Sequence, residues 1–348
     1  MLQAKMLQLL EFDKIKNQLE EHAETSLGKE KAKQLAPFYE YDQVAYALAE
    51  TDEALTAMRL KGEPTFGGIR DIRDKIKRAA IGSILHPQEF VDIATTLIGA
   101  RRLKKYIDAL QEENSELSIL PEHSSLIQPC HKLEAEINRC IDRNGKIVDD
   151  ASPELSNIRR RMKNYETQIR EKLEQIVRTN SHKLSDAIIT IRNDRFVIPV
   201  KADYRASFGG IVHDESASGQ TVFIEPNAVV SINNQLREAQ NKEKQEIEKI
   251  LRKLTEQVAQ HADLLFTNVE QLAVLDFMFA KARYARQIKA TKPKLNTSSY
   301  LRFVKARHPL ISPEKVVPIS VQLGNEYRTM VITGPNTGGK TVTSDCFH

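Results

Sequence analysis

The sequence predicts a mainly α-helical protein that carries a small antiparallel β module and, near residue 300, the beginning of an α/β domain. Glycine and proline, which interrupt helices, number only 14 and 13 among 348 residues. Residues 227–292 contain neither, which is typical of long helices. Short β-rich runs gather instead at 186–225 and beyond residue 293.

Apolar residues recur at helical spacing through the first part of the chain. Pro37 stops the first run, and Pro87 suits the first turn of a long helix. The polar segments 62–68 and 114–123 are predicted to be connections. The helices predicted here cover residues 7–36, about 42–60, about 71–80 and 87–113.

A tight hairpin is predicted where Asn144-Gly145 separates residues 139–142 from residues 146–149, because Asn-Gly supplies two positive φ angles. Ser152 and Pro153 then provide the cap and first position of a helix that runs to about Leu184.

Residues 186–225 predict a four-stranded antiparallel module. Asn193-Asp194 separates its first two strands, and a loop with serine and glycine separates the other two. The predicted strands cover 187–192, 195–200, 209–213 and 221–224.

The run 227–292 should break once or twice, since one helix of that length would reach about 100 Å. Its segment 237–249 is almost entirely charged or amide, and an apolar face begins at Ile250. Helices at 153–184 and 227–265 would then form an antiparallel coiled-coil arm with the module at its tip. The alternative is two ordinary helices packed on the sheet in one compact domain. The charged segment favours the arm, because it lacks an apolar face to bury.

Strand candidates lie at 300–306 and 316–321, and the almost fully apolar run 329–333 is typical of a strand buried in a parallel sheet. This last run leads into a full match to the phosphate-binding pattern GxxxxGK[ST]. The matching residues are Gly334, Pro335, Asn336, Thr337, Gly338, Gly339, Lys340 and Thr341. Backbone N–H groups would surround the phosphates of ATP, Lys340 would reach the β- and γ-phosphates, and the Thr341 hydroxyl would bind Mg²⁺.

Residues 342–348 are all that follows this motif. A nucleotide-binding fold needs further parallel strands and an acidic residue that holds magnesium. We therefore expect the domain to be incomplete in this chain, and the chain alone to be inactive as an ATPase.

The composition excludes several classes of protein. Lys+Arg 51 and Asp+Glu 47 give a net charge of +4, so the chain is not a polycation. There is no apolar run of about 18 residues for a membrane span, and the N-terminus lacks the pattern of a signal peptide. Three scattered cysteines, Cys130, Cys140 and Cys346, favour a reducing cytoplasm over a disulfide or zinc framework, and Cys346 is predicted to be incidental.

Pro335-Asn336 within the phosphate-binding loop, with Ala306-Arg307-His308-Pro309-Leu310 upstream, resembles the MutS-family ATPases. Residues 140–149, 149–155 and 219–226 resemble the second bacterial MutS type. The resemblance covers about residues 1–343.

This resemblance implies core and lever helices at 1–152, a clamp at 153–292 with a β-tip at 186–225, and the start of the ATPase domain at 293–348. It implies ATP hydrolysis by a homodimer formed through the ATPase domain, and an endonuclease domain beyond this chain, so no nuclease residue is assigned here. It also implies two functions: binding of branched or duplex DNA with suppression of homologous recombination, and binding of collided ribosomes through rRNA with their splitting by ATP. By the family layout, Val316 and Val317 are candidates for packing on adenine.

The candidate contacts to a nucleic-acid backbone are a basic cluster on the first arm; the alternative is an ordinary solvated helix face. The cluster consists of Arg159, Arg160, Arg161 and Lys163. Four basic and five acidic residues nearly balance between 186 and 215, which suits a shaped surface of rRNA and protein at least as well as a free duplex.

Two histidines allow a local interpretation. His308 could lie near the nucleotide, but it could equally cap a turn with Pro309. His213, with Asp214 and Glu215, is predicted to face solvent.

Three functional classes remain open. The first is an ATP-dependent clamp acting on nucleic acid or ribosomes, and the second is a non-enzymatic nucleic-acid-binding clamp or dimerisation module. The third is a cohesion-type ATPase, which is disfavoured because those chains place the phosphate-binding loop ahead of the arm.

Overall fold

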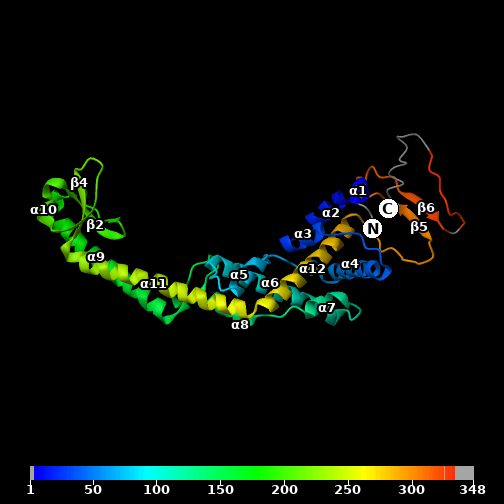
Figure 1. The fold of residues 1–348 in the computed structure, drawn as a ribbon, viewed down its shortest axis with the longest axis horizontal. Helices are drawn as coiled ribbons and strands as arrows, with labels where there is room; N and C mark the ends of the chain where they lie inside the picture. Colours follow the sequence, from blue (N-terminus) through cyan, green and yellow to red (C-terminus); the bar gives the residue numbers. More distant parts are fainter. Residues whose placement is uncertain (1–3, 325, 334–348) are drawn as a thin grey trace. The chain divides into compact units, whose positions relative to one another are not determined.

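The computed structural model, which describes residues 4–324 and 326–333, confirms a mainly α-helical protein with a small antiparallel sheet (Figure 1). The helices of the first part are α1 (Ala4–Leu9), α2 (Phe12–Glu21), α3 (Ser26–Lys33), α4 (Tyr41–Lys61), α5 (Arg73–Ala80), α6 (Pro87–Glu113), α7 (Ile119–Ser125) and α8 (His131–Cys140). Those of the second part are α9 (Pro153–Thr179), α10 (Arg205–Phe208), α11 (Asn227–Gln260) and α12 (Ala262–Gln287).

The chain forms two compact units, which we describe separately. One comprises residues 78–91 and 132–260, and the other comprises the segments up to 77, 92–131 and from 261 onward. The division of the sequence at residues 152 and 292 into three functional domains stays a prediction.

Helix α12 is the centre of the unit that contains the N-terminal segment, and it packs against α2, α3, α4 and α7. Its residue Asp276 is fully buried and accepts hydrogen bonds from the Thr25 backbone N–H (2.8 Å) and the Thr25 hydroxyl (2.6 Å). The same hydroxyl accepts from the Gly28 N–H and so caps α3. A side chain at position 28 would overlap the Asp276 carboxylate, so the site requires glycine. A buried charge on α12 therefore fixes the start of α3.

The predicted helix 7–36 is wrong as a single element, because the chain turns twice within it. Glu11 adopts a left-handed conformation between α1 and α2, and the Thr25 cap starts α3. The predicted connection 114–123 is also partly helical, since α7 begins at Ile119. The Glu53 carboxylate of α4 accepts from the backbone N–H groups of Ser118 and Ile119 and so caps α7 from a distant part of the sequence.

The hairpin at Asn144-Gly145 is smaller than predicted. Helix α8 continues to Cys140, so a single bridge, Ile141 with Ile147, remains between the two sides. Gly145 has a φ of 76°, whereas Asn144 does not have a positive φ. Asp142 closes the loop instead, because its carboxylate accepts from the N–H groups of Asn144 and Lys146 (both 2.9 Å).

Helix α9 begins as predicted. The Ser152 hydroxyl accepts from the Leu155 N–H (3.0 Å), and Pro153 holds the first position. The helix ends at Thr179, before the predicted Leu184, which pairs with Val200 in an isolated bridge.

The predicted four-stranded sheet is confirmed, with strand order β1-β2-β4-β3 and antiparallel pairs throughout. Asn193 and Asp194 have φ angles of 50° and 61°, as a tight hairpin turn requires. One face of the sheet forms a common core with the adjoining ends of α9 and α11. The strands are β1 (Thr190–Arg192), β2 (Arg195–Lys201), β3 (Gly210–Glu215) and β4 (Thr221–Pro226).

The run 227–292 breaks once within its helical part, at His261 between α11 and α12. Strands β5 (Leu301–Ala306) and β6 (Ile319–Leu323) form an antiparallel pair, so the strand predicted from residue 316 begins later. The strand predicted at 329–333 is wrong for the described residues, which are exposed there and have no regular structure. A buried parallel strand depends on neighbouring strands, and neither β5 nor β6 pairs with this segment.

Replacement of Asp276 by alanine is expected to destabilise the unit centred on α12 by about 3–5 kcal/mol. The change would leave the Thr25 donors without an acceptor and the nearby buried Arg283 without one of its carboxylates. Urea unfolding monitored by circular dichroism would measure it. The control Gln287→Ala, exposed at the end of the same helix, should change stability by no more than about 0.5 kcal/mol. Equal stability of both variants would contradict this role for Asp276.

Candidate nucleic-acid interface

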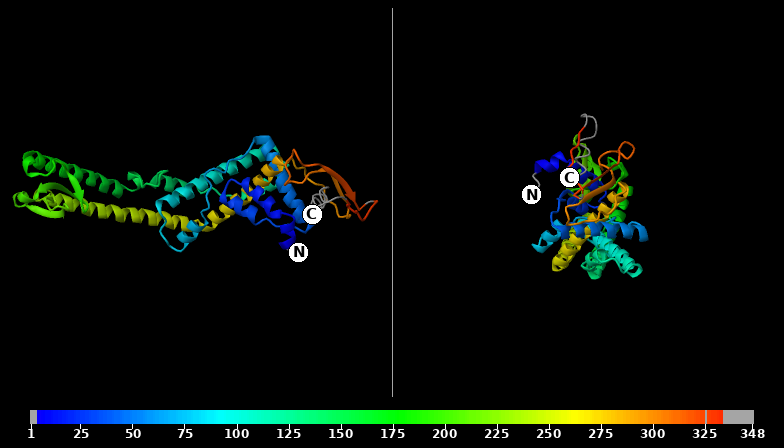
Figure 2. Two further views of the ribbon diagram at one scale, coloured as in Figure 1. Left: turned by 90° about the horizontal axis from the view of Figure 1, so that it is seen from above. Right: turned by 90° about the vertical axis from the view of Figure 1, so that its right-hand side faces the viewer.

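The basic cluster predicted from the sequence lies on α9, which runs antiparallel to α11 within one compact unit (Figures 1 and 2). Near the sheet the two helices share an apolar core that includes Ile169, Leu173, Ile232 and Leu236. Toward the other end, Leu155 on α9 and the apolar residues of α11 from Ile250 onward are also buried. Between these apolar ends lies the charged segment 237–249.

The charged segment is held to α9 by polar contacts. Arg159 Nε donates to Glu243 (2.7 Å), and its Nη1 donates to the Ile147 carbonyl (2.9 Å) and to Asp149 (2.5 Å). The Ser152 hydroxyl donates to Glu246 (2.8 Å), whose carboxylate is largely buried. The expectation that this segment has no face to bury is therefore corrected: it buries the side chains of Ala239 and Glu246.

The four predicted cations are not equivalent. Arg159 is partly buried and fully engaged in the contacts just described. Arg160, Arg161 and Lys163 are exposed. Because successive helical residues are about 100° apart, these side chains point in different directions around α9. The basic cluster therefore consists of Arg159, which joins α9 to α11, and three surface cations on different sides of α9.

Arg161 lies on a flank of the helix pair where charges are paired. It lines a small pocket with Tyr165, Glu238 and Lys242. Lys242 forms an ion pair with Glu238 (2.6 Å), and its hydrogen bond holds the pKa of that carboxyl below the ordinary value. Two further lysines on α11 are also paired: Lys249 with Glu246 and Lys253 with Glu136.

The sheet carries a buried polar cluster that the sequence did not indicate. Glu225 on β4 is fully buried, and its carboxylate accepts from Asn233 of α11 (2.8 Å). Arg195 on β2 (3.2 Å) and His213 on β3 (2.5 Å) complete the cluster. The prediction that His213 faces solvent is therefore wrong. The register of β3 shifts between Val212 and Asp214, and this irregularity brings His213 to the carboxylate.

The remaining charges of the sheet are also mostly paired with one another. Arg192 lies 4.3 Å from the centre of the Phe223 ring and forms an ion pair with Asp214 (3.2 Å). Arg205 pairs more loosely with Glu215 (3.7 Å). The balance of charge seen in the sequence thus corresponds to internal pairing.

Most of the predicted nucleotide site lies outside the described residues. All eight residues of the phosphate-binding motif, 334–341, lie outside the described residues. Val316 is half-buried and Val317 is 78% exposed, both just before β6, so their contact with adenine stays a prediction. His308 accepts a hydrogen bond from the Leu310 N–H through Nδ1 (3.3 Å), which bears out the turn-capping alternative.

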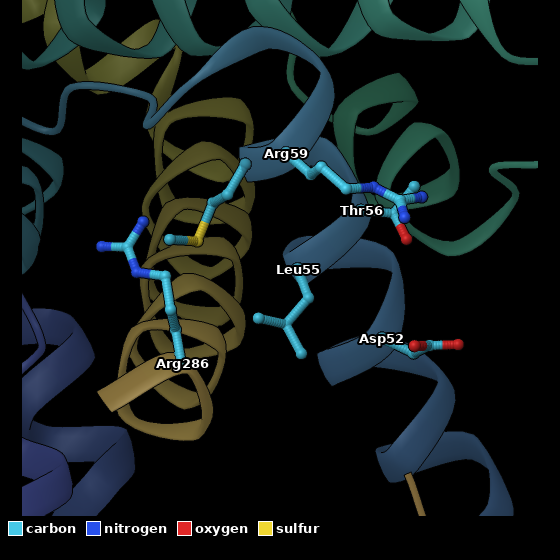
Figure 3. A pocket seen from close by; sticks show the side chains of 6 residues that line it. Asp52, Leu55, Thr56, Arg59 and Arg286 are labelled. Carbon is cyan, nitrogen blue, oxygen red and sulfur yellow. The ribbon is translucent and has the colours of Figure 1, made fainter. Parts of the chain in front are cut away.

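A pocket between α4 and α12 offers little for a ligand (Figure 3). It is lined by Asp52, Leu55, Thr56, Met58, Arg59 and Arg286. Asp52 already pairs with Lys292 (3.0 Å), and Arg286 pairs with Glu63. The charged groups at its rim are thus largely committed to ion pairs within the same unit.

Two further observations concern membrane spans and cysteines. Within residues 4–324 and 326–333, the helices are too short or too polar for any of them to cross a membrane. Cys130 and Cys140 are buried and form no disulfide, and burial raises the pKa of the Cys140 thiol.

Known proteins resemble the chain along nearly its whole length, although no family model matches it. An "Endonuclease MutS2" of Geobacillus sp. (strain WCH70) is 53% identical over 344 residues, which cover 98% of this chain and 44% of the relative. The protein of the same name from Bacillus mycoides (strain KBAB4) is 52% identical over 97% of the chain and 43% of its own length. That of Halalkalibacterium halodurans is 51% identical over 97% and 44%.

The fold is that of a mainly helical protein in which α9 and α11 form an antiparallel pair with a four-stranded sheet at one end. The identity of 51–53% over 97–98% of the chain shows that it belongs to the MutS family, in its second bacterial type, MutS2. The chain spans less than half the length of the curated relatives it matches.

Neighbouring arginines of the cluster should respond differently to the same substitution. Arg159→Gln removes charge-assisted hydrogen bonds between α9 and α11 and is expected to lower stability by about 2 kcal/mol. Arg160→Gln, on the exposed side, should change stability by no more than about 0.5 kcal/mol. Thermal and urea unfolding would compare the two. Equal losses would show that Arg159 does not hold the helix pair.

Proposed function

We propose that this chain is the nucleic-acid-binding clamp part of a MutS2-type ATPase. The observation that carries the proposal is the identity of more than 50%, over nearly the whole chain, to proteins named endonucleases. An endonuclease by definition acts on nucleic acid. The helix pair of α9 and α11, with the sheet at its end, supplies an extended surface on which a long polymer can be held.

ATP is proposed to bind at the phosphate-binding motif. Lys340 would contact the β- and γ-phosphates, and the Thr341 hydroxyl would bind Mg²⁺. The support is the sequence pattern alone. We further propose that longer relatives act as homodimers through their ATPase domains, and that this chain alone does not hydrolyse ATP.

The polymer is proposed to be DNA or the RNA of a ribosome. Branched or duplex DNA fits a protein that suppresses recombination, and collided ribosomes fit one that splits them. The internally paired charges of the sheet favour recognition by shape, which suits a surface of rRNA and protein. A non-enzymatic clamp is the second candidate, supported by the extensive helix pair within the chain itself.

Lys340→Ala should weaken binding of Mg·ATP by the chain at least tenfold, because the lysine is the cation proposed to meet the phosphates. Isothermal titration of the chain and its variant would measure this. Lys315 lies outside the motif and provides the control, so Lys315→Ala should bind Mg·ATP as the parent does. Measurable ATP turnover by the parent chain, lost in Lys340→Ala, would contradict the proposed inactivity.

Glu225→Gln should loosen the sheet and reduce discrimination between polymers more than general affinity. The variant keeps the size of the side chain but removes the charge shared by Arg195 and His213, and breaking such a buried pair costs about 3–5 kcal/mol. Hydrogen exchange in β3 and β4 would report the loosening. Relative binding of ribosomes, branched DNA and linear duplex would report discrimination.

The matched control for this change is Glu215→Gln on β3, whose carboxylate is half-exposed and only loosely paired. It should leave both readouts close to those of the parent. If Glu225→Gln loosens the sheet but all three polymers bind as before, the sheet does not take part in recognition.

A further inference from the structure

The two flanks of the α9–α11 pair differ in how their charged side chains are paired. On the flank with Arg161, the lysines of α11 form ion pairs. Other cations on these helices have no carboxylate within 4 Å in the described chain. One of these, Lys172, donates to the Ala228 carbonyl instead (3.5 Å). Arg161 is another, and it donates to the Tyr165 hydroxyl (3.4 Å). The rest are Arg160, Lys163, Arg170, Arg237 and Lys244.

Helix geometry places four of these cations on the opposite flank. At about 100° per residue, Lys163 lies about 160° around α9 from Arg161, and Arg170 follows it by two turns. On α11, Lys244 lies about 160° from Lys242, and Arg237 precedes it by two turns. Arg161 and Lys242 line one pocket on the first flank, so the other four residues share the second.

The antiparallel register brings the cations of the two helices level. The contacts of Arg159 with Glu243 and of Ser152 with Glu246 fix this register. Lys163 consequently lies level with Arg237, to within about one turn. Arg170 marks the end nearest the sheet, where its guanidinium lies 5.2 Å from the centre of the Phe196 ring.

The acidic residues of this flank do not cancel its charge. Glu243 is bound to Arg159, and Glu174 lies 3.7 Å from Arg178. Glu166 and Glu171 of α9 have no basic side chain within 4 Å among the described residues, and they leave the flank with an excess of positive charge. The four cations of the flank are therefore available to an anionic partner, whereas Arg160 is partly engaged by Asn157.

We propose that this flank, formed by Lys163, Arg170, Arg237 and Lys244 with Arg160 at its outer edge, is the face of the helix pair that binds the phosphate backbone of a nucleic-acid duplex. The inference rests on the proposed function, which it makes specific by naming the contact surface. The structure distinguishes these residues from Arg159 and Arg161, which the sequence grouped with Arg160 and Lys163.

The spacing of the cations fits a duplex backbone. Residues two turns apart on a helix are separated by about 10 Å along its axis. Each strand of a duplex presents a phosphate about every 3.4 Å along its axis, so each cation can reach one. Arginine and lysine are also the side chains that contact phosphates most often.

An acidic protein is a poorer fit to this face. Protein interfaces depend on a few large apolar or aromatic anchors at their centre. None of the exposed large apolar residues of the described chain lies on α9 or α11. The flank offers charge together with hydroxyl and amide groups, such as those of Thr167 and Asn241.

The test compares two double variants of the full chain that remove equal charge. Lys163→Gln/Arg237→Gln removes one cation from each helix on the proposed face, and Lys242→Gln/Lys249→Gln removes two from the opposite flank. Fluorescence anisotropy would measure binding to a DNA duplex and an RNA duplex of equal length between about 0.05 and 0.2 M salt. Thermal unfolding would verify that both variants fold.

The variant of the proposed face should bind roughly tenfold more weakly, and its slope of log K against log salt should flatten by about 0.9 per lost contact with DNA. The control should keep the parent slope. Loss with either duplex supports the proposal, and a loss confined to one identifies the polymer.

If the parent binds but both double variants lose affinity equally, or neither does, this inference fails while the proposed function stands. If the parent binds neither duplex, this inference is overturned. If the parent also fails to bind ribosomes and branched DNA, the proposed function is overturned with it. Polyglutamate serves as a probe for an acidic protein partner. If Lys163→Gln/Arg237→Gln keeps nucleic-acid binding but no longer binds polyglutamate, the face binds an acidic protein and the inference fails.

Discussion

The polar contact of Arg159 with Glu243 and Asp149 is the constraint on which the arrangement of the helix pair depends. Apolar side chains hold α9 to α11 near the sheet. At the charged stretch 237–249, Ile158 and Ala239 are buried beside one small pocket, and the Arg159–Glu243 ion pair joins the two helices. Arg159 also binds the Ile147 carbonyl, so one side chain ties both helices to the loop that precedes α9. A guanidinium suits this position because its donors form a fixed planar fork that can satisfy several acceptors together.

Residue type alone did not reveal which charges are structural, because helical phase decides the role of each. Arg159 lies beside buried Ile158 at the edge of the apolar stripe, whereas Arg160 lies one step further round and is exposed. The position of each arginine around α9 could be predicted from the sequence, because the apolar residues of that helix recur at regular spacing. The acidic partner of Arg159 could not be predicted, because Glu243 is 84 residues away along the chain.

The elements predicted best were those fixed by local chemistry. Ser152-Pro153 and Asn193-Asp194 set a helix start and a turn through their own backbone preferences. The failures depended on distant partners: Glu53 caps α7 from α4, and no strand among the described residues provides the pairing for the segment 329–333 that its composition had predicted. The buried position of Glu225 could not be predicted from the sequence, because its partners Arg195 and His213 lie on other strands and only the fold brings them to it.

In the proposed clamp, the internally paired charges of the sheet and the unpaired cations of the helices would serve discrimination and affinity respectively. The charged side chains of the sheet pair with one another. The sheet would therefore attract a distant phosphate backbone only weakly, and would recognise a polymer by its shape. The helices carry unpaired cations, whose attraction acts on any phosphate backbone and weakens with salt. Contacts made by the sheet should depend on salt far less, since few counterions would be released there. If the proposal holds, the salt dependence of binding would measure the part played by the helices, and the binding that persists at high salt would measure the part played by the sheet.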